Sequence, residues 1–347
     1  MKARSHDTHP PRQDPAAWDR RRFLASGVGL IAASRLTGST PAGGARDVDG
    51  PAPGSHTARS RQDPKSETVT LNNGVKMPLL GLGTYQMNGA DCERSVAEAL
   101  EGGYRLFDTA TAYRTEEAVG KAVKQSGVPR EQIFVTTKLW VSDAGYEKAK
   151  AAFDRSMERL GLEYLDLYLI HQPYNDVYGS WRAMEELHRA GRIKAIGVSN
   201  FHPDRVMDLI LHHEVKPAVN QIETHVFYPQ TEAQQFLVEQ GVQMQGWAPF
   251  AEGRNNMFQN EVLKKIGSKY EKSVAQVVLR WLTQRSVVAI PKSIKKAHIL
   301  ENIDVFDFQL SPEDLAEIAK LGTEKSAFFD HRDPRVVQMI AGRRRNR

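Results

Sequence analysis

The 347-residue sequence contains a single cysteine, Cys92, and no uninterrupted apolar run of 18 residues. One cysteine excludes an intrachain disulfide and the cysteine-rich zinc sites, so the fold must be held together by its hydrophobic core. Without such an apolar run, no segment has the length and composition of a transmembrane helix, and no membrane span is expected. The hydrophobic fraction of 40% and the charged fraction of 26% are ordinary for a globular protein.

The main part of the sequence also lacks an excess of charge of either sign. Residues 1–65 hold 11 Lys and Arg against 6 Asp and Glu, whereas residues 66–347 hold 36 of each kind, so the net charge of +5 comes from the N-terminal segment. Four arginines lie in the closing RRRNR, residues 343–347, which we interpret as a solvated basic tail. Because the charge is not spread over the rest of the chain, no nucleic-acid partner is expected.

Residues 1–65 show no helical or strand periodicity outside one short apolar run, and they are rich in Pro, Gly, Ser, Arg and Asp. The stretch RRRFL, residues 20–24, resembles the twin-arginine export consensus, in which Arg20 and Arg21 would be the two arginines. The apolar run that follows is rich in Gly and Ala. We therefore expect a twin-arginine signal and linker over 1–65, the twin-arginine translocase as a partner, and a periplasmic or extracellular location. The alternative is a chance basic segment, which would leave the protein in the cytoplasm.

From residue 66 onward, short β-rich runs alternate with helical patterns. The pair Asn73–Gly74, between short apolar stretches, indicates a β-hairpin. Eight strand–helix pairs follow, with strands predicted at 79–85, 105–110, 133–138, 165–170, 195–199, 218–223, 242–247 and 287–291. Eight such pairs predict an α/β fold, a (β/α)₈ TIM barrel over residues 66–342, with one extra helix at 311–322.

A doubly wound dinucleotide-binding sheet is the weaker alternative. No predicted strand is followed by G-x-G-x-x-G, since in GLGTYQ the third glycine is replaced by Gln86. In a TIM barrel, by contrast, the chemistry lies where the strands end and the βα loops begin. The side chains at those ends are therefore the candidates for the site.

Three consecutive strand ends carry reactive side chains: Asp108 with Tyr113 in the next loop, Lys138, and His171. A charged Lys138 near Tyr113 would lower the pKa of the phenol, while Asp108 would hold the ammonium in place. Such a phenol can donate a proton to a carbonyl oxygen, and His171 can hydrogen-bond and orient the same oxygen. No nucleophile is paired with a base, which disfavours acyl transfer, and a hydride donor is the missing component.

These residues and their surroundings resemble the aldo-keto reductases. The matching stretches are FDTATAYRTEEAVGKAV (107–123), TTKLW (136–140), YLDLYLIHQP (164–173), GVSNF (197–201), NQIETH (220–225) and IPKS (290–293). FFDHRDP (328–334) is similar to the bacterial branch that includes 2,5-diketo-gluconate reductases and small α-dicarbonyl reductases. The resemblance implies an NADPH-dependent reductase of aldehydes or ketones. Its catalytic tetrad would be Asp108, Tyr113, Lys138 and His171, with hydride from nicotinamide C4 and a proton from Tyr113.

The resemblance also implies a cofactor site. Ser199, Asn200 and Gln221 match carboxamide ligands, and Trp247 matches the aromatic ring that stacks on the nicotinamide. The residues expected to hold the phosphates, the ribose and the adenine are Lys292, Ser293, Ile294, Lys295, His298, Glu301 and Asn302. His298 stands where the family usually has an arginine, and a neutral imidazole lacks the permanent charge of arginine. We therefore expect weaker discrimination against NADH than is usual in the family.

The substrate pocket is predicted to be apolar with a polar floor. Tyr85, Trp140 and Phe250 occupy loops that typically wall it, and His171 contributes to the floor. Such a pocket suits small aldehydes, α-dicarbonyls or keto-sugars, and the resemblance implies a monomer. Two other functions remain open: an NADPH-binding redox sensor with little turnover, and a lyase or aldolase that uses Lys138 as a Schiff-base amine.

Overall fold

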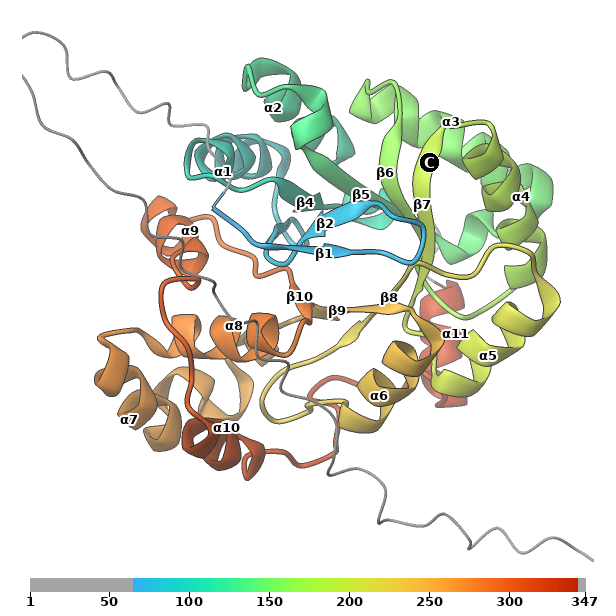
Figure 1. The fold of residues 1–347 in the computed structure, drawn as a ribbon. Helices are drawn as coiled ribbons and strands as arrows, with labels where there is room; N and C mark the ends of the chain where they lie inside the picture. Colours follow the sequence, from blue (N-terminus) through green and yellow to red (C-terminus); the bar gives the residue numbers. More distant parts are fainter. Residues whose placement is uncertain (1–64, 343–347) are drawn as a thin grey trace, which may run out of the picture. The chain divides into compact units, whose positions relative to one another are not determined.

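The computed structural model describes residues 65–342, and within them the chain forms a parallel β-barrel surrounded by helices (Figure 1). The barrel strands are β3 (Leu82–Gly83), β4 (Leu106–Asp108), β5 (Phe134–Leu139), β6 (Leu165–Ile170), β7 (Ile193–Ser199), β8 (Val219–Glu223), β9 (Gln243–Trp247) and β10 (Val288–Ala289). They pair in sequence order in one sheet. A parallel bridge between Leu80 and Ala289 joins the first strand region to the last, which closes the barrel.

The helices alternate with these strands, as the sequence pattern predicts. They are α1 (Gly89–Glu101), α2 (Glu116–Gln125), α3 (Tyr146–Leu160), α4 (Val177–Arg189), α5 (Pro203–His212), α6 (Thr231–Gln240), α7 (Glu261–Tyr270), α8 (Val274–Gln284) and α9 (Lys296–Ile303). Local caps fix several of their starts: Ser273 begins α8 with a reciprocal capping box in which Gln276 is the partner. The (β/α)₈ TIM barrel is therefore confirmed, and a doubly wound sheet is excluded.

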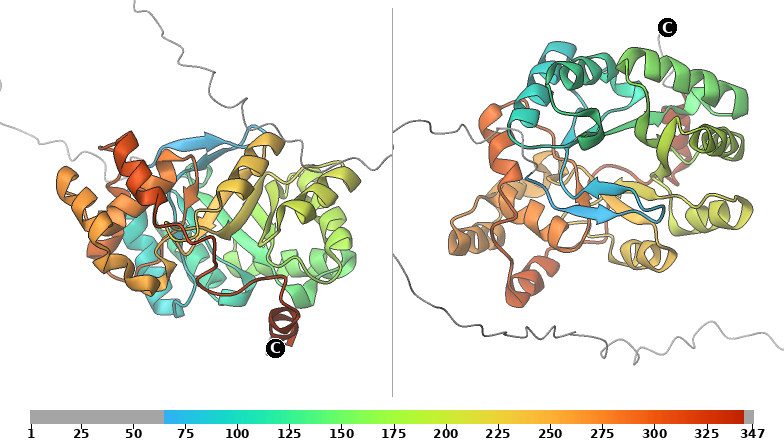
Figure 2. Two further views of the ribbon diagram at one scale, coloured as in Figure 1. Left: turned by 90° about the horizontal axis from the view of Figure 1, so that it is seen from below. Right: turned by 45° about the horizontal axis from the view of Figure 1, so that its top comes forward.

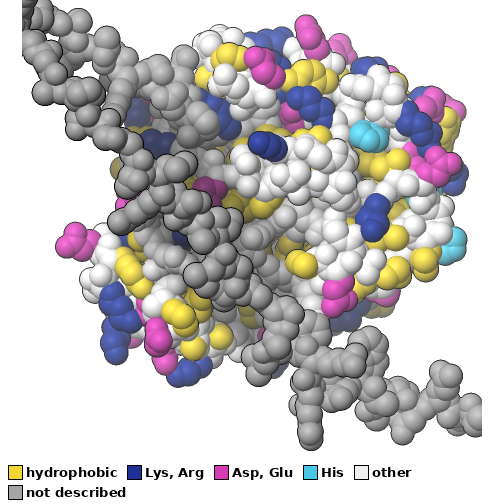
Figure 3. Space-filling view, in the orientation of Figure 1, with side chains coloured by type: hydrophobic (Ala, Val, Ile, Leu, Met, Phe, Trp, Pro, Cys, Tyr) yellow, Lys and Arg dark blue, Asp and Glu magenta, His cyan; other side chains and the backbone are white. Residues whose placement is uncertain are grey.

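The predicted hairpin is present at one end of the barrel. Strands β1 (Thr68–Thr70) and β2 (Lys76–Pro78) pair antiparallel, and Gly74 turns the chain with a φ of +86°, a conformation that suits glycine. Leu71 and Met77 are buried in a cluster that also contains Leu106 and Leu167. The hairpin thus closes the end of the barrel where the strands begin. Figure 3 views this face, on whose described part acidic and basic side chains are interspersed.

Two elements follow the barrel, whereas the sequence pattern predicts one. Helix α10 (Pro312–Ala319) confirms the predicted helix and begins with a capping box between Ser311 and Asp314. Helix α11 (Pro334–Gly342) is an addition, and it lies at the end of the barrel opposite the hairpin (Figure 2). There Ile340 packs in a cluster with Trp140 and Val141. The C-terminal part of the chain therefore covers the rim at which the strands end.

The main hydrophobic core lies between the barrel and its ring of helices, where Trp181, Phe153 and Tyr168 are fully buried. Cys92 also lies in this core as a free thiol. Across residues 65–342 the helices are too short or too polar to cross a bilayer, and no cluster of His, Cys, Asp or Glu is arranged to bind a metal. The proposed twin-arginine signal and the basic tail lie outside the described residues.

Candidate active site

The four strand-end residues predicted from the sequence meet at one end of the barrel. Asp108 ends β4, Lys138 lies near the end of β5, and His171 directly follows β6. Tyr113 ends the short helix η1 (Thr111–Tyr113), in the loop after β4. Parallel strands bring their carboxyl ends to the same rim, which is why residues 63 positions apart in the chain, Asp108 and His171, belong to one site.

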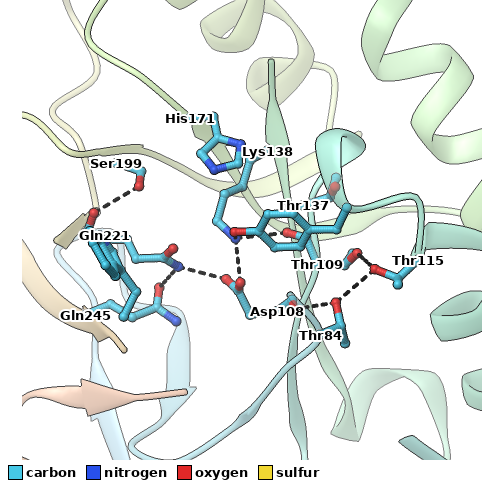
Figure 4. Close-up of polar contacts among 12 residues, drawn as sticks. Thr84, Asp108, Thr109, Thr115, Thr137, Lys138, His171, Ser199, Gln221 and Gln245 are labelled. Carbon is cyan, nitrogen blue, oxygen red and sulfur yellow. Dashed lines mark hydrogen bonds and ion pairs between the residues drawn. The ribbon is translucent and has the colours of Figure 1, made fainter. Parts of the chain in front are cut away.

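Lys138 and Asp108 form a buried ion pair at the base of this site (Figure 4). Both side chains are almost completely inaccessible to solvent. The Lys138 ammonium also donates to the backbone carbonyl of Thr109 at 3.0 Å. Burial raises the pKa of Asp108 and lowers that of Lys138, and in each case the charge of the partner opposes the effect. Each of the two charges therefore depends on the other for its stability inside the protein.

Gln221 completes the base of the site. Its side-chain amide donates to the second carboxylate oxygen of Asp108 at 2.7 Å and to the side-chain oxygen of Gln245 at 3.0 Å (Figure 4). This amide is supplied by β8, which lies on the opposite side of the barrel from β4. The carboxylate is thus fixed from both sides, which fixes the position of Lys138 in turn.

Tyr113 lies above this pair. Its hydroxyl is 3.5 Å from the Lys138 ammonium, which itself lies 4.8 Å from the centre of the phenol ring. Burial, and then the charges of Asp108 and Tyr85, raise the pKa of Tyr113 well above 10. The prediction of a lowered pKa for this phenol is therefore wrong, because the burial of the phenol outweighs the effect of the Lys138 ammonium, whose charge is shared with Asp108. The hydroxyl keeps its proton at neutral pH.

His171 presents a neutral imidazole beside the phenol. Its ring lies 5.6 Å from that of Tyr113 and 5.1 Å from that of Trp140, edge-on in both contacts. Burial, followed by the charge of Lys138, lowers the pKa of His171 well below 6.5. Its Nδ1 atom is buried and has no hydrogen-bond partner among the described residues. The neutral imidazole and the protonated phenol each offer one hydrogen-bond donor, and neither adds a positive charge.

Most of the predicted site residues line one cavity of about 930 Å³. Those that line it are Asp108, Tyr113, His171, Ser199, Asn200, Gln221, Trp247 and Lys292, together with the predicted pocket walls Tyr85, Trp140 and Phe250. Lys138 lies behind this wall, completely buried. The remaining predicted residues lie directly before α9 or along it: Ser293, Ile294, Lys295, His298, Glu301 and Asn302.

One wall of the cavity consists of polar groups from β7 and β8 and the indole of Trp247. The hydroxyl of Ser199 donates to the backbone carbonyl of Gln221 at 2.9 Å. The side-chain amide of Asn200 donates to the carbonyl of His171 at 3.0 Å, and its oxygen accepts the indole N–H of Trp247 at 2.9 Å. These bonds set the plane of the indole against the site. That these side chains contact a cofactor remains a prediction.

The region after β10 has the features of a phosphate site. Lys292 is exposed in the cavity wall. Lys295 is the N-cap residue of α9, and its side chain makes no hydrogen bond to the N-terminus of that helix. The hydroxyl of Ser293 accepts the backbone N–H of Lys295 at 3.1 Å and shapes the turn. Helix N-termini attract anions, and the ammonium of Lys292 adds a charge. His298 is exposed on the first turns of α9, whereas Asn302 is buried.

Several cavity residues were not predicted from the sequence. They include, in the cavity wall, Arg254, Phe328, Phe329, His331 and Ile340, and, next to the cavity, Gln245, which is hydrogen-bonded to Gln221. The stretch FFDHRDP carried a signal for Phe328 and Phe329, because phenylalanine side chains are more often buried than exposed. Arg254 and Gln245 had no such signal.

Comparison with known proteins identifies the family. The model of the Aldo/keto reductase family matches residues 79–323. A glyoxal reductase from Bacillus subtilis is 49% identical over 261 residues, covering 75% of this chain and 94% of that protein. A methylglyoxal reductase from Escherichia coli is 41% identical over 260 residues, covering 74% and 94%. Among solved structures, a Bombyx mori aldo-keto reductase in complex with NADP superposes with a TM-score of 0.73 at 32% identity, covering 76% of this chain and 95% of that chain.

Proposed function

Because the chain belongs to the aldo/keto reductase family, we propose that it reduces small aldehydes and ketones, α-dicarbonyls in particular, to alcohols with NADPH. The observation that carries this proposal is the protonated Tyr113 hydroxyl, 3.5 Å from Lys138 and beside a neutral His171 in one cavity. The similar glyoxal and methylglyoxal reductases support α-dicarbonyls as the substrate class.

NADPH fits the residues of the cavity. Ser199, Asn200, Gln221 and Trp247 form a polar and aromatic wall at one position, and Lys292 with the start of α9 provides a cationic site at another. Lys292, Ser293 and Lys295 would hold the phosphate of the adenosine. When bound, NADPH supplies the hydride that reduces the carbonyl carbon.

The protein itself handles the carbonyl oxygen. The hydroxyl of Tyr113 donates its proton to that oxygen as negative charge develops there, and His171 donates a hydrogen bond that orients it. The phenolate that remains is stabilised by the Lys138 ammonium, which Asp108 holds in place. Trp140, Tyr85 and Phe250 bound the volume that the substrate occupies.

The direct test is NADPH oxidation by the purified protein with glyoxal and methylglyoxal, followed by the loss of absorbance of the reduced nicotinamide. We expect steady turnover with each dicarbonyl and none in its absence. A single-turnover measurement on the protein loaded with NADPH separates an enzyme from a sensor. No oxidation within that first turnover would contradict the proposal and favour the redox-sensing function.

The rate of carbonyl reduction should not fall as the pH is lowered through 6.5. The pKa of His171 lies well below 6.5, so this residue stays neutral, and the pKa of Tyr113 lies well above 10, so its proton is retained on the alkaline side. The measurement is kcat/KM between about pH 5.5 and about pH 9. A fall with a midpoint near 6.5 would show that His171 titrates as an exposed histidine does.

The His298→Arg variant should bind NADPH more tightly relative to NADH, by about threefold to tenfold. Arginine offers a permanent charge and a planar fork to the phosphate that only NADPH carries. Affinities for the two nucleotides would be measured by quenching of tryptophan fluorescence. His212→Arg is the matched control, since His212 is exposed on α5, away from the cavity. An unchanged ratio in His298→Arg would contradict a role for this position in discrimination.

We further propose export through the twin-arginine route. The sequence RRRFL and the neutral apolar run after it support this proposal, and a single buried Cys92 is compatible with folding in the cytoplasm before export. That route would carry the enzyme with its nucleotide already bound. Cell fractionation should find the wild type outside the cytoplasm and the Arg20→Lys/Arg21→Lys variant inside it. Retention of both in the cytoplasm would contradict export.

A further inference from the structure

The C-terminal segment Ser326–Gly342, called here the strap, forms one wall of the catalytic cavity. It contributes Phe328, Phe329, His331 and Ile340 to the cavity lining. The ring of Phe328 lies 5.2 Å from that of Trp247. In Figure 2 the strap crosses the end of the barrel opposite the hairpin and ends in α11. The strap is hydrogen-bonded to the barrel and its loops at that rim, so the residues that anchor it influence the shape of the cavity.

Glu223, at the end of β8, is one of these anchors. Its side chain is buried, with the residue 4% exposed, and its two carboxylate oxygens accept three hydrogen bonds. Two donors come from the strap: the hydroxyl of Ser326 at 2.5 Å and the backbone N–H of Ala327 at 2.7 Å. The third is the Nε2 atom of His225 at 2.9 Å. All the donors converge on one charged acceptor, the arrangement in which hydrogen bonds are strongest.

The hydrogen-bond pattern of His225 fixes the direction of that third bond. The Nδ1 atom of His225 accepts the backbone N–H of Tyr228 at 3.1 Å, so the ring carries its proton on Nε2, which points at Glu223. His225 is completely buried. It therefore holds the carboxylate in the orientation in which both oxygens meet the strap.

The bonds to Ser326 extend to the two phenylalanines. The hydroxyl oxygen of Ser326 accepts the backbone N–H of Phe328 at 3.0 Å and that of Phe329 at 3.0 Å. Glu223 thus fixes Ser326, and Ser326 fixes the backbone at the point where both aromatic rings enter the cavity wall.

Arg254 holds the same peptide segment from the other side. It belongs to the loop segment η4 (Ala251–Gln259), and its guanidinium donates to the carbonyl of Ala327 at 2.6 Å and stacks 4.3 Å from the centre of the Phe328 ring. Ala327 therefore has its N–H bound to Glu223 and its carbonyl bound to Arg254. Arg254 is half exposed, whereas Glu223 is buried, so the buried carboxylate is the stronger of the two anchors.

We propose that Glu223 is a positioning residue that sets the substrate affinity of the cavity by anchoring the strap. It does not line the cavity, so it acts through Ser326 and the backbone of Phe328 and Phe329 rather than by touching the substrate. The proposal rests on the proposed function in one respect: the cavity that the strap closes is taken to bind the carbonyl compound. Loss of the anchor lets the two phenylalanines move from the wall while the Asp108–Lys138 pair, held by β4 and β5, stays in place.

The test is Glu223→Gln, which keeps the shape of the side chain but replaces one acceptor oxygen by a donor NH₂ group that faces another donor. We expect KM for methylglyoxal to rise by about tenfold or more, kcat to change by less than about threefold, and hydrogen exchange at the amides of 326–331 to become faster. Ser326→Ala is a milder second variant with the same expected direction, and Ser326→Thr, which keeps the hydroxyl, should restore the wild-type values. Glu317→Gln, an exposed glutamate on α10, is the matched control.

Two results would overturn the proposal. One is a folded Glu223→Gln protein with unchanged KM and unchanged exchange over 326–331, and the other is equal loss in Ser326→Ala and Ser326→Thr. Hydrogen exchange does not require turnover, so it tests the anchor even if the wild type reduces no carbonyl. In that case the proposed function fails while the anchoring role of Glu223 is still decided by the exchange of the strap.

Discussion

The Tyr113→Phe variant should lose between about two and four orders of magnitude in kcat for carbonyl reduction, while it keeps its affinity for NADPH. Only the hydroxyl is removed, and that hydroxyl is the one proton donor placed next to both Lys138 and His171 in the described cavity. The ring remains to pack against Tyr85 at 5.0 Å, so the cavity keeps its shape.

The size of this effect follows from the lack of a substitute. His171 is neutral, and the Lys138 ammonium is fully buried and bound to Asp108 and the carbonyl of Thr109. Neither can deliver a proton to a carbonyl oxygen with comparable geometry, so the transition state loses most of the stabilisation that proton transfer provides.

The measurement is kcat for methylglyoxal together with the dissociation constant of NADPH from tryptophan fluorescence. Tyr164→Phe is the matched control, since it removes the same atom from a ring that packs against Arg130 and Lys194, just before the start of β6. Its kcat should stay at the wild-type value. A Tyr113→Phe protein with more than about a tenth of wild-type kcat would mean that another group donates the proton.

The sequence was sufficient to predict the barrel and to bring the four strand-end residues together. The reason is that strand and helix patterns are local, and a parallel barrel then places every strand end at one rim. We could identify Asp108, Lys138 and His171 as site residues from their positions relative to β4, β5 and β6 alone, without knowledge of side-chain contacts.

Contacts between distant segments were not predictable in this way. The bond from Gln221 to Asp108 spans 113 positions, and that from Ser326 to Glu223 spans 103. No periodicity encodes such pairs, which is why the strap and the role of Gln245 were missed. The same limit explains the wrong direction for the pKa of Tyr113: the charge of Lys138 and its pairing with Asp108 could be predicted from the sequence, whereas the burial of the phenol could not.

The site therefore combines two kinds of element with different origins. The tetrad lies on strand ends and on the loop directly after β4, and the barrel fixes its geometry. Another part of the cavity wall is contributed by the loop η4 and the strap, and the strap is held by individual side chains such as Glu223 and Arg254. Substitutions in the first group should change kcat, and substitutions in the second should change KM, which is the distinction that the Tyr113 and Glu223 variants measure.

The Lys138→Met variant should lose about 3–5 kcal/mol of unfolding free energy in addition to its activity. It leaves the Asp108 carboxylate buried without a counter-charge, since Gln221 supplies only a neutral donor. Without Lys138 the pKa of Asp108 rises further, so the folded state binds the proton more tightly than the unfolded state. A carboxyl whose pKa is raised on folding destabilises the protein as the pH rises above the unfolded value of about 3.9. The loss should therefore be smaller at acidic pH and largest at neutral pH.

Urea unfolding at two pH values measures this loss, and two further variants separate its cause. Lys320→Met removes an exposed lysine that pairs with Glu317 and should cost less than about 1 kcal/mol. Asp108→Asn combined with Lys138→Met removes both charges, so it should recover much of the stability but none of the activity, because the ammonium beside Tyr113 is still missing. If Lys138→Met were as stable as Lys320→Met at neutral pH, the pair would not be a buried ion pair, and the ammonium that stabilises the phenolate would have to be sought elsewhere in the cavity.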